Sequence, residues 1–275
     1  MYTYHMILGE NSKLEAGISY LQSELNFQMS EGGFPVTFCK EGENTKVQVK
    51  KNKESACITY GRTVGAFRGL FLLVAHQEEE SFCIEENCCF HDFGAMIDMS
   101  RNAVMKPESV KRLIVKMALL GYESMQVYTE DTLKVAAEEY MGYGRGAYYC
   151  EEIKAMDQFA MQFGIELIPC IECLAHLNQL CIYTRYSLMM DTNDILMVGE
   201  PRTYEFIEHI FQMISESYSS RKVNVGMDEA SMLGRGSYLE KNGYRPRAEL
   251  MAEHTEKVNE IAKKYGLKVI YDAAH

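Results

Sequence analysis

Two adjacent carboxylates, Asp228 and Glu229, are the strongest candidates for acid–base chemistry in this chain. They follow a short β-branched segment, residues 223–225, and a glycine, Gly226, so they are predicted to lie where a strand ends. Neighbouring carboxylates repel each other, and burying both requires a partner or a shared proton. We interpret them as a functional pair, and the alternative is a solvated pair of acids in a loop.

Acidic residues also occur at the ends of the other strands predicted in this part of the chain. They are Asp98 at the first strand, Glu130 and Asp131 at the second, Glu172 with His176 after the third, and Asp272 at the last. In a parallel barrel these strand ends lie on one rim, where active sites are built. A rim of carboxylates with one histidine suits carbohydrate chemistry or a metal site. Acids that simply favour loops would explain one or two strand ends rather than all of them.

A possible metal motif lies within the third strand end. Cys170, Cys173 and His176 have zinc-like spacing, but no second ligand pair is evident, and Cys170 falls inside an apolar strand. A redox-active Cys pair would open a helix, and this one does not. We therefore predict neither a bound metal nor any other cofactor.

Glycines at positions 142, 144 and 146 form a second motif. They do not lead from a strand directly into a helix, as a phosphate-binding loop does. We interpret this segment as a loop over the rim, in which Arg145 could reach a substrate. Tyr128 and Tyr143 are candidates for stacking on a sugar ring.

The secondary structure around these residues alternates between strand and helix. Pro107 suits the first turn of a helix, and glycines such as Gly121 and Gly164 end two of the helices. The alternation predicts parallel βα units and an α/β fold, an incomplete (β/α) TIM-type barrel of about five units. The predicted strands are 93–98, 124–129, 165–171, 223–226 and 267–271, and the predicted helices are 107–120, 151–163, 203–217 and 248–265.

The first part of the chain has a different order of elements and carries no convincing chemistry. Its predicted order is β-α-β-β-β-α, followed by one short strand in an acidic stretch. We place a boundary there, which gives an N-terminal α/β domain over residues 1–88 and the partial barrel over 89–275. The predicted strands are 3–8, 34–39, 47–49, 56–60 and 81–84, and the predicted helices are 10–25 and 63–76.

The composition excludes several classes of partner. The 275 residues include 39 Asp+Glu against 28 Lys+Arg, a net charge of -11, and no basic stripe is present. Nucleic acid and anionic membrane are therefore poor partners. The N-terminus lacks the features of a signal peptide, and no apolar run approaches the ~18 residues that cross a bilayer. With nine cysteines, this favours reduced thiols and a cytoplasmic location.

Four motifs, in order and spacing, resemble a known family. They are Ala-Met-Ile-Asp-Met-Ser-Arg (95–101), Tyr-Thr-Glu-Asp (128–131), Ile-Pro-Cys-Ile-Glu-Cys-Leu-Ala-His (168–176) and Val-Asn-Val-Gly-Met-Asp-Glu (223–229). Together they resemble the family 20 glycoside hydrolases, the β-N-acetylhexosaminidases, and especially the bacterial exo-acting N-acetylglucosaminidase branch. The resemblance covers about residues 91–272, and the N-terminal part resembles the small α/β domain that precedes the barrel in this family.

The resemblance implies substrate-assisted catalysis, in which the acetamido oxygen of the substrate attacks the anomeric carbon. It implies that Asp228 orients and stabilises the acetamido group and that Glu229 protonates the leaving oxygen. The glutamic acid must be protonated before the reaction, and a neighbouring anion helps to raise its pKa. The expected partner is a glycan that carries terminal β-linked N-acetylglucosamine or N-acetylgalactosamine.

The resemblance also implies supporting residues. Glu172 and His176 correspond to the family's Asp and His on the third strand, with Glu172 longer by one methylene group. Glu130 and Asp131 correspond to its acid pair on the second strand. Asp98 belongs to the first motif and Arg101 follows it in the loop, so both are candidate substrate-binding or supporting residues.

Two departures from the family pattern qualify this interpretation. Phe93 stands where much of the family has an arginine that holds the outer hydroxyls of the sugar. In addition, a complete eight-stranded barrel takes roughly 250 residues, whereas only about 185 follow the N-terminal domain, so a C-terminally truncated barrel without Trp is expected. Its open edge predicts a homo-oligomer, a second polypeptide that supplies the missing part, or partial disorder.

Three hypotheses about function follow from these residues. The first is a glycosidase that hydrolyses terminal β-linked N-acetylhexosamine through Asp228 and Glu229. The second is a catalytically impaired remnant or a sugar-binding subunit. The third is a metal-dependent hydrolase that uses the rim acids and His176.

Overall fold

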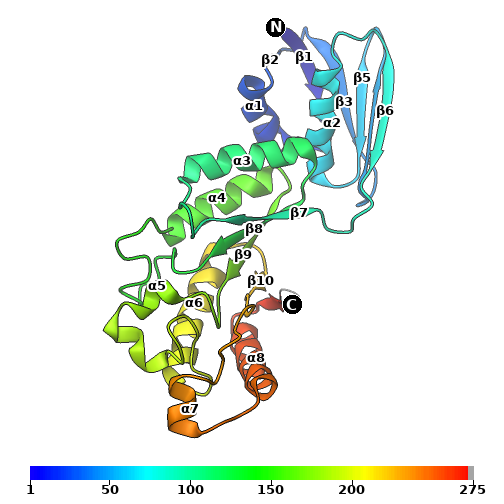
Figure 1. Ribbon diagram of the computed structural model, residues 1–275. Coiled ribbons are helices and arrows are strands. Elements are labelled where there is room, and N and C mark those ends of the chain that lie inside the picture. Colours follow the sequence, from blue (N-terminus) through cyan, green and yellow to red (C-terminus); the bar gives the residue numbers. More distant parts are fainter. Residues whose placement is uncertain (272–275) are drawn as a thin grey trace. The chain divides into compact units, whose positions relative to one another are not determined.

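The computed structural model describes residues 1–271, and the predicted strand-end acid Asp272 lies outside the described residues (Figure 1). The chain forms two compact units that interleave along the sequence. The first contains Met1–Ala95, Pro107–Met125 and Gln158–Glu166, and the second contains Met96–Lys106, Gln126–Asp157 and the chain from residue 167 onward. The boundary after residue 88 therefore stays a prediction. Among the described helices, none combines the length and apolar character needed to span a bilayer.

A six-stranded sheet with the order β2-β1-β3-β5-β4-β6 organises the first unit. Strand β1 pairs in parallel with β2 and β3, and β3 pairs in parallel with β5. Strand β4 is antiparallel to both β5 and β6. The strands are β1 (Tyr2–Ile7), β2 (Phe27–Met29), β3 (Phe34–Lys40), β4 (Lys46–Lys51), β5 (Ala56–Tyr60) and β6 (Phe82–Asn87).

One face of this sheet is buried by helices. Alternate residues such as Val36, Phe38 and Ile58 are fully or almost fully buried, as a half-covered sheet requires. Helices α1 (Glu15–Glu24), preceded by the short η1 (Ser12–Leu14), and α2 (Thr63–Ala75) lie on the same side of the sheet (Figure 1). Gly69 allows a close approach of α2, because a Cβ there would lie 2.4 Å from a methyl carbon of Ile58.

The second sheet has five strands in the order β11-β10-β9-β8-β7. Strand β10 is parallel to both neighbours. Strands β7 and β8 also run in the same direction, because Glu123 N bonds to Phe93 O before them and Met99 N bonds to Tyr128 O after them. This confirms the predicted α/β fold with a partial barrel. The strands are β7 (Gly94–Asp98), β8 (Ser124–Thr129), β9 (Glu166–Ile171), β10 (Lys222–Asn224) and β11 (Lys268–Ile270).

Four long helices connect these strands, as predicted. They are α3 (Pro107–Leu120), α4 (Cys150–Gln162), α6 (Pro201–Ser217) and α8 (Arg247–Lys264). The connections after β9 and β10 contain three further short helices, α5 (Asn178–Cys181), η2 (Thr184–Met189) and α7 (Ser237–Asn242). The sequence did not predict these, because a helix of one or two turns is too short to show a repeating apolar pattern.

Candidate active site

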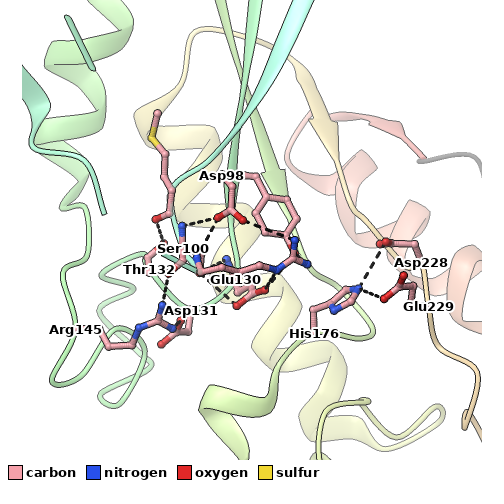
Figure 2. Close-up of polar contacts among 12 residues, drawn as sticks. Asp98, Ser100, Glu130, Asp131, Thr132, Arg145, His176, Asp228 and Glu229 are labelled. Carbon is pink, nitrogen blue, oxygen red and sulfur yellow. Dashed lines mark hydrogen bonds and ion pairs between the residues drawn. The ribbon is translucent and has the colours of Figure 1, made fainter. Parts of the chain in front are cut away.

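The acidic residues predicted at strand ends lie at the carboxyl ends of neighbouring parallel strands (Figure 2). All of those described belong to the second compact unit. Their side chains differ in environment, from a fully buried Glu172 to a largely exposed Glu229. The set is Asp98 at the end of β7, Glu130 and Asp131 after β8, Glu172 after β9, and Asp228 and Glu229 after β10.

Asp98 shapes the turn that presents Arg101. Its Oδ1 accepts hydrogen bonds from the backbone amides of Ser100, at 2.9 Å, and Arg101, at 3.0 Å. The Arg101 side chain then donates from Nε to Glu130 Oε1 at 3.0 Å and from Nη2 to the Tyr128 hydroxyl at 2.8 Å. Glu130 is thereby held by a cation, although it is only 7% exposed.

Tyr128 is not available to stack on a sugar, so that interpretation is wrong. The residue is buried, and the Arg101 guanidinium lies over its ring at 4.8 Å from the centroid. Its hydroxyl donates to Glu130 Oε1 at 3.3 Å. Burial and the neighbouring Glu172 and Glu130 carboxylates raise the pKa of Tyr128, which keeps this hydroxyl protonated and available as a donor.

Asp131 is paired with the arginine of the glycine-containing loop. Arg145 forms an ion pair with Asp131 and also donates to the backbone carbonyl of Ser100. Burial raises the pKa of Asp131, and the Arg145 charge partly offsets this. Arg145 therefore ties the loop after β8 to the loop after β7, in addition to facing the cavity described below.

Glu172 is a buried carboxyl group, and few polar contacts offset the free-energy cost of its burial. It is 1% exposed, and within the described part of the chain neither of its oxygens makes a hydrogen bond of normal geometry. Burial, followed by the charge of Asp228, raises the pKa of Glu172 to about 8, although the nearby Tyr128 hydroxyl and Met227 amide act in the opposite direction. At neutral pH the favoured form is therefore the neutral acid.

The backbone that carries Asp228 and Glu229 is strained. Gly226, Met227 and Glu229 have φ angles of +60°, +79° and +52°. For residues other than glycine this region costs on the order of 1–3 kcal/mol, and such residues concentrate at functional sites. Gly226 was placed at the strand end by the sequence, and the structure shows the reason for a glycine, since its Cα faces the Glu172 carboxyl group.

His176 brings the two adjacent acids together. Its Nε2 lies 3.6 Å from Asp228 Oδ2 and 3.6 Å from Glu229 Oε2 (Figure 2). Nε2 is buried and, among the described residues, has no hydrogen-bond partner at normal distance. His176 itself has a φ of +57°. The imidazole is thus held between two carboxylates by a locally strained backbone.

Two cavities flank this arrangement. The first has a volume of about 390 Å³ and is polar, and the second has a volume of about 300 Å³. Both volumes lie near the lower end of the ~300–1,000 Å³ typical of ligand sites. The first is lined by Arg101, Glu130, Arg145, His176, Asn178, Gln179, Asn193 and Asp194. The second is lined by Met227, Asp228, Glu229, Ala230, Ser231, Arg247, Ala248 and Met251.

The sequence did not identify Asp191 as a site residue. It is 3% exposed, and its carboxylate accepts hydrogen bonds from the amides of Gly234 at 2.5 Å, Gly236 at 3.1 Å and Tyr238 at 2.8 Å. These amides belong to the connection that follows Asp228 and Glu229. Asp191 therefore anchors that connection, and no local sequence signal distinguishes it from any other loop aspartate.

The residues of the Cys-x-x-Cys-x-x-His motif have different roles: the two cysteines pack in the core, and the histidine contacts the acid pair. Cys170 and Cys173 are fully buried, and His254 Nε2 contacts the carbonyl of Cys173 at 2.8 Å. Burial lowers the pKa of His254 to about 4 and raises that of Cys173. Across residues 1–271, no group of three or more His, Cys, Asp or Glu side chains has an arrangement that could hold a metal ion.

The fold and site together define an α/β protein of the parallel-barrel type, with a polar cavity and a set of carboxyl groups at the strand carboxyl ends. Residues 90–273 match the family model for the glycosyl hydrolase family 20 catalytic domain. The match covers most of the chain, and the chain therefore belongs to glycosyl hydrolase family 20.

Solved structures of this family have the same fold. They include the exo β-N-acetylglucosaminidase of Vibrio harveyi in complex with N-acetylglucosamine (18% identity, TM-score 0.77, 98% of this chain and 51% of that chain). The β-N-acetylhexosaminidase of Streptomyces coelicolor A3(2) is also similar, with 18% identity and a TM-score of 0.74 over 98% of this chain and 61% of that chain. The chitobiase of Flavobacterium johnsoniae has 16% identity and a TM-score of 0.77 over 98% of this chain and 48% of that chain. The present chain thus spans about half to three fifths of the length of these proteins.

Phe93 occupies the position where the family resemblance placed a sugar-binding arginine. It precedes β7 in the first compact unit, and its ring stacks on Tyr122 with centroids 4.2 Å apart. Its role here is packing. Arg101 is the cationic residue of this strand-end segment that lines the polar cavity.

Proposed function

We propose that this chain hydrolyses terminal β-linked N-acetylhexosamine by a substrate-assisted, retaining mechanism. The observation that carries the proposal is the position of His176 Nε2, 3.6 Å from both Asp228 and Glu229. One imidazole in contact with both acids holds the two side chains beside each other at the strand end, so that a single substrate can meet both.

Each acid then has a separate task. Asp228 accepts the N–H of the substrate's acetamido group, so that the acetamido oxygen attacks the anomeric carbon and forms a cyclic intermediate. Glu229 donates its proton to the departing glycosidic oxygen as that bond breaks. Glu229, now a carboxylate, takes a proton from the water that opens the intermediate, and the anomeric configuration is retained.

Glu172 limits the charge beneath this pair. With its pKa raised to about 8, it is neutral near pH 7 and adds no negative charge of its own beside the acid pair. We assign Glu172 a positioning and electrostatic role rather than direct contact with the substrate, because it is 1% exposed.

The polar cavity supplies binding groups for sugar hydroxyls. Arg101 and Arg145 offer donors, and Glu130 offers acceptors, as a neutral polyhydroxylated ligand requires. The proposed partner is therefore a glycan or glycoconjugate that ends in N-acetylhexosamine. A cytoplasmic location, and association with a second copy or another polypeptide, stay predictions from the sequence.

Turnover of an aryl β-N-acetylglucosaminide tests the proposal, with Glu229→Gln and Asp228→Asn measured beside it. We expect each variant to lose about 10²–10⁴-fold in kcat, the usual contribution of a general acid or of charge stabilisation. The matching aryl glucoside, which lacks the acetamido group, should not be hydrolysed. If the glucoside is hydrolysed at a comparable rate, the substrate-assisted mechanism is wrong.

A second candidate is a protein that binds the sugar without turnover. The exposure of the Glu229 side chain, 78%, favours it, because water competes with an exposed general acid and weakens its electrostatic control. Saturable binding of N-acetylglucosamine, detected by NMR line broadening, together with no chromophore release by the folded parent chain, would establish this alternative.

A further inference from the structure

A cavity of about 270 Å³ lies in the first compact unit, and the proposed hydrolysis does not use it. Its walls come from the turn before β4, the end of β6, the start of α2, the end of α3 and the segments that lead into β7 and β8. All of these lining residues belong to the first unit, whereas Asp228 and Glu229 belong to the second. The cavity is therefore a candidate site for a ligand other than the glycan.

An arginine and a glutamate present opposite charges side by side in this cavity. Arg62 Nη1 forms an ion pair with Glu123 and donates to the carbonyl of His91 at 2.7 Å. Within residues 1–271, Arg62 Nη2 and Glu123 Oε1 make no hydrogen bond. The two side chains are 27% and 13% exposed, so water only partly screens their charges. The cavity thus offers a ligand one donor on a cation and one acceptor on an anion.

The other cations of the cavity are already paired with carboxylates. Arg68 donates from Nε at 2.8 Å and from Nη2 at 2.7 Å to the two carboxylate oxygens of Glu86. This contact lowers the pKa of Glu86, which keeps it ionised at neutral pH. Lys46 pairs with Glu85 at 3.1 Å. A ligand with a single charge would leave one member of the Arg62–Glu123 pair without a partner, whereas a ligand with both charges contacts each member.

Apolar side chains also line the cavity. Val47 and Val64 are 5% and 4% exposed, and Leu120 is 58% exposed. Phe93 packs on Tyr122 and lines the cavity as well. A volume of about 270 Å³ equals that of about nine water molecules at ~30 Å³ each, so the ligand has on the order of ten non-hydrogen atoms.

We propose that this cavity binds a small zwitterion, an amino acid with an apolar side chain. Its carboxylate accepts a hydrogen bond from Arg62, and its ammonium group donates to Glu123. Its side chain packs against Val47, Val64 and Phe93. This site is independent of the proposed function, because none of these residues contacts the acid pair of the second unit.

Titration calorimetry on the full-length chain with L-leucine tests this site. The analogue 4-methylpentanoate is leucine without its ammonium group, and 3-methylbutylamine is leucine without its carboxylate. We expect leucine to bind about tenfold tighter than either analogue, the usual effect of one hydrogen bond to a charged group. Glycine has both charges but no apolar side chain, and it should also bind more weakly than leucine.

Glu123→Gln should reduce the preference for leucine over 4-methylpentanoate to less than about twofold, because an amide has no charge to pair with the ammonium group. Glu80→Gln is the matched control. It removes the same charge from the first unit, at a side chain that is 75% exposed and does not line the cavity, and it should keep the tenfold preference.

Amide NMR spectra of the parent chain give a second measurement that does not depend on the folding of a variant. Leucine should shift the signals of Gly65 and Gly121, which line the cavity. The proposal is overturned if leucine does not bind, if leucine and either analogue bind equally, or if the preference survives Glu123→Gln. Shifts that spare Gly65 and Gly121 would also overturn it. None of the probes is a sugar, so these outcomes do not bear on the proposed function.

Discussion

A Cβ atom at Gly226 would lie 2.3 Å from Oε2 of Glu172, closer than side chains approach in folded proteins. Gly226→Ala must therefore move either the buried carboxyl group or the backbone that carries Asp228 and Glu229. We expect a loss of about 2–4 kcal/mol in the free energy of unfolding. We also expect at least a tenfold loss in kcat, because either movement changes the surroundings of the acid pair. Urea denaturation and steady-state kinetics measure the two effects.

Gly266→Ala is the control for this variant. Gly266 also has a positive φ, +66°, but a Cβ there would meet no atom within 4 Å. Its substitution should lower the free energy of unfolding only by the cost of placing an alanine in the left-handed backbone region, about 1–2 kcal/mol, and leave kcat unchanged. Equal effects of the two substitutions on kcat would show that the contact with Glu172 has no role in the site.

Glu172 makes stability depend on pH in a defined direction. Its pKa is raised from 4.5 to about 8 in the folded chain, so between these values the folded state holds a proton that the unfolded state has released. The stabilising contribution is complete below about 4.5 and is lost as pH rises towards 8. Glu172→Gln stays neutral, so its melting temperature relative to the parent should rise by several degrees across this window.

Thermal melts at a series of pH values give this comparison. Glu80→Gln, at a surface carboxylate of the first unit that is 75% exposed, is the control for the loss of one carboxyl group. If the melting temperatures of the parent and of Glu172→Gln differ by a constant amount from about pH 5 to pH 8, Glu172 is ionised in the folded protein.

Asp191 should control the connection after β10 without touching the substrate. Asp191→Ala leaves three buried amides without their acceptor, which we expect to cost about 2–4 kcal/mol in unfolding free energy. Because the same connection begins at Asp228 and Glu229, kcat should fall more than KM changes. Asp191→Asn keeps an acceptor oxygen and should be intermediate. Asp92→Ala, at a side chain that is 69% exposed, provides the control and should change neither quantity.

The Asp131–Arg145 pair should be strongly coupled. Arg145→Ala leaves Asp131 buried without this cation, and we expect a loss of about 3 kcal/mol, at the lower end of the range for buried pairs because Arg145 is 24% exposed. Asp131→Asn in the Arg145→Ala background should recover part of the loss. A double-mutant cycle measured by chemical denaturation gives the coupling energy, and strictly additive effects would contradict the pairing.

Most of the fold could be predicted because its long elements have clear periodicity. Helix α3 and strand β8 begin and end where the apolar pattern and the flanking Pro107 and Gly121 indicate. Strand β2 was not predicted, since its three residues are too few to show alternation, and it exists through pairing with β1. The same limit applies to α5, η2 and α7.

The site could be predicted only as a set of residues. Parallel βα units bring strand ends together, so the acids could be assigned to one rim from their order along the chain. Asp191 could not be found, because its role depends on three amides more than 40 residues away in the sequence. Tyr128 was misjudged because nothing in the sequence shows that Arg101 covers its ring.

Residue types and their order established the alternation of elements, the rim of acids and the adjacency of Asp228 and Glu229. Three-dimensional packing established that His176 Nε2 lies at equal distance from both acids and that Glu172 is shielded from water. The physical reason is that protonation depends on distance and on access to water, and both are set by residues far apart in the chain.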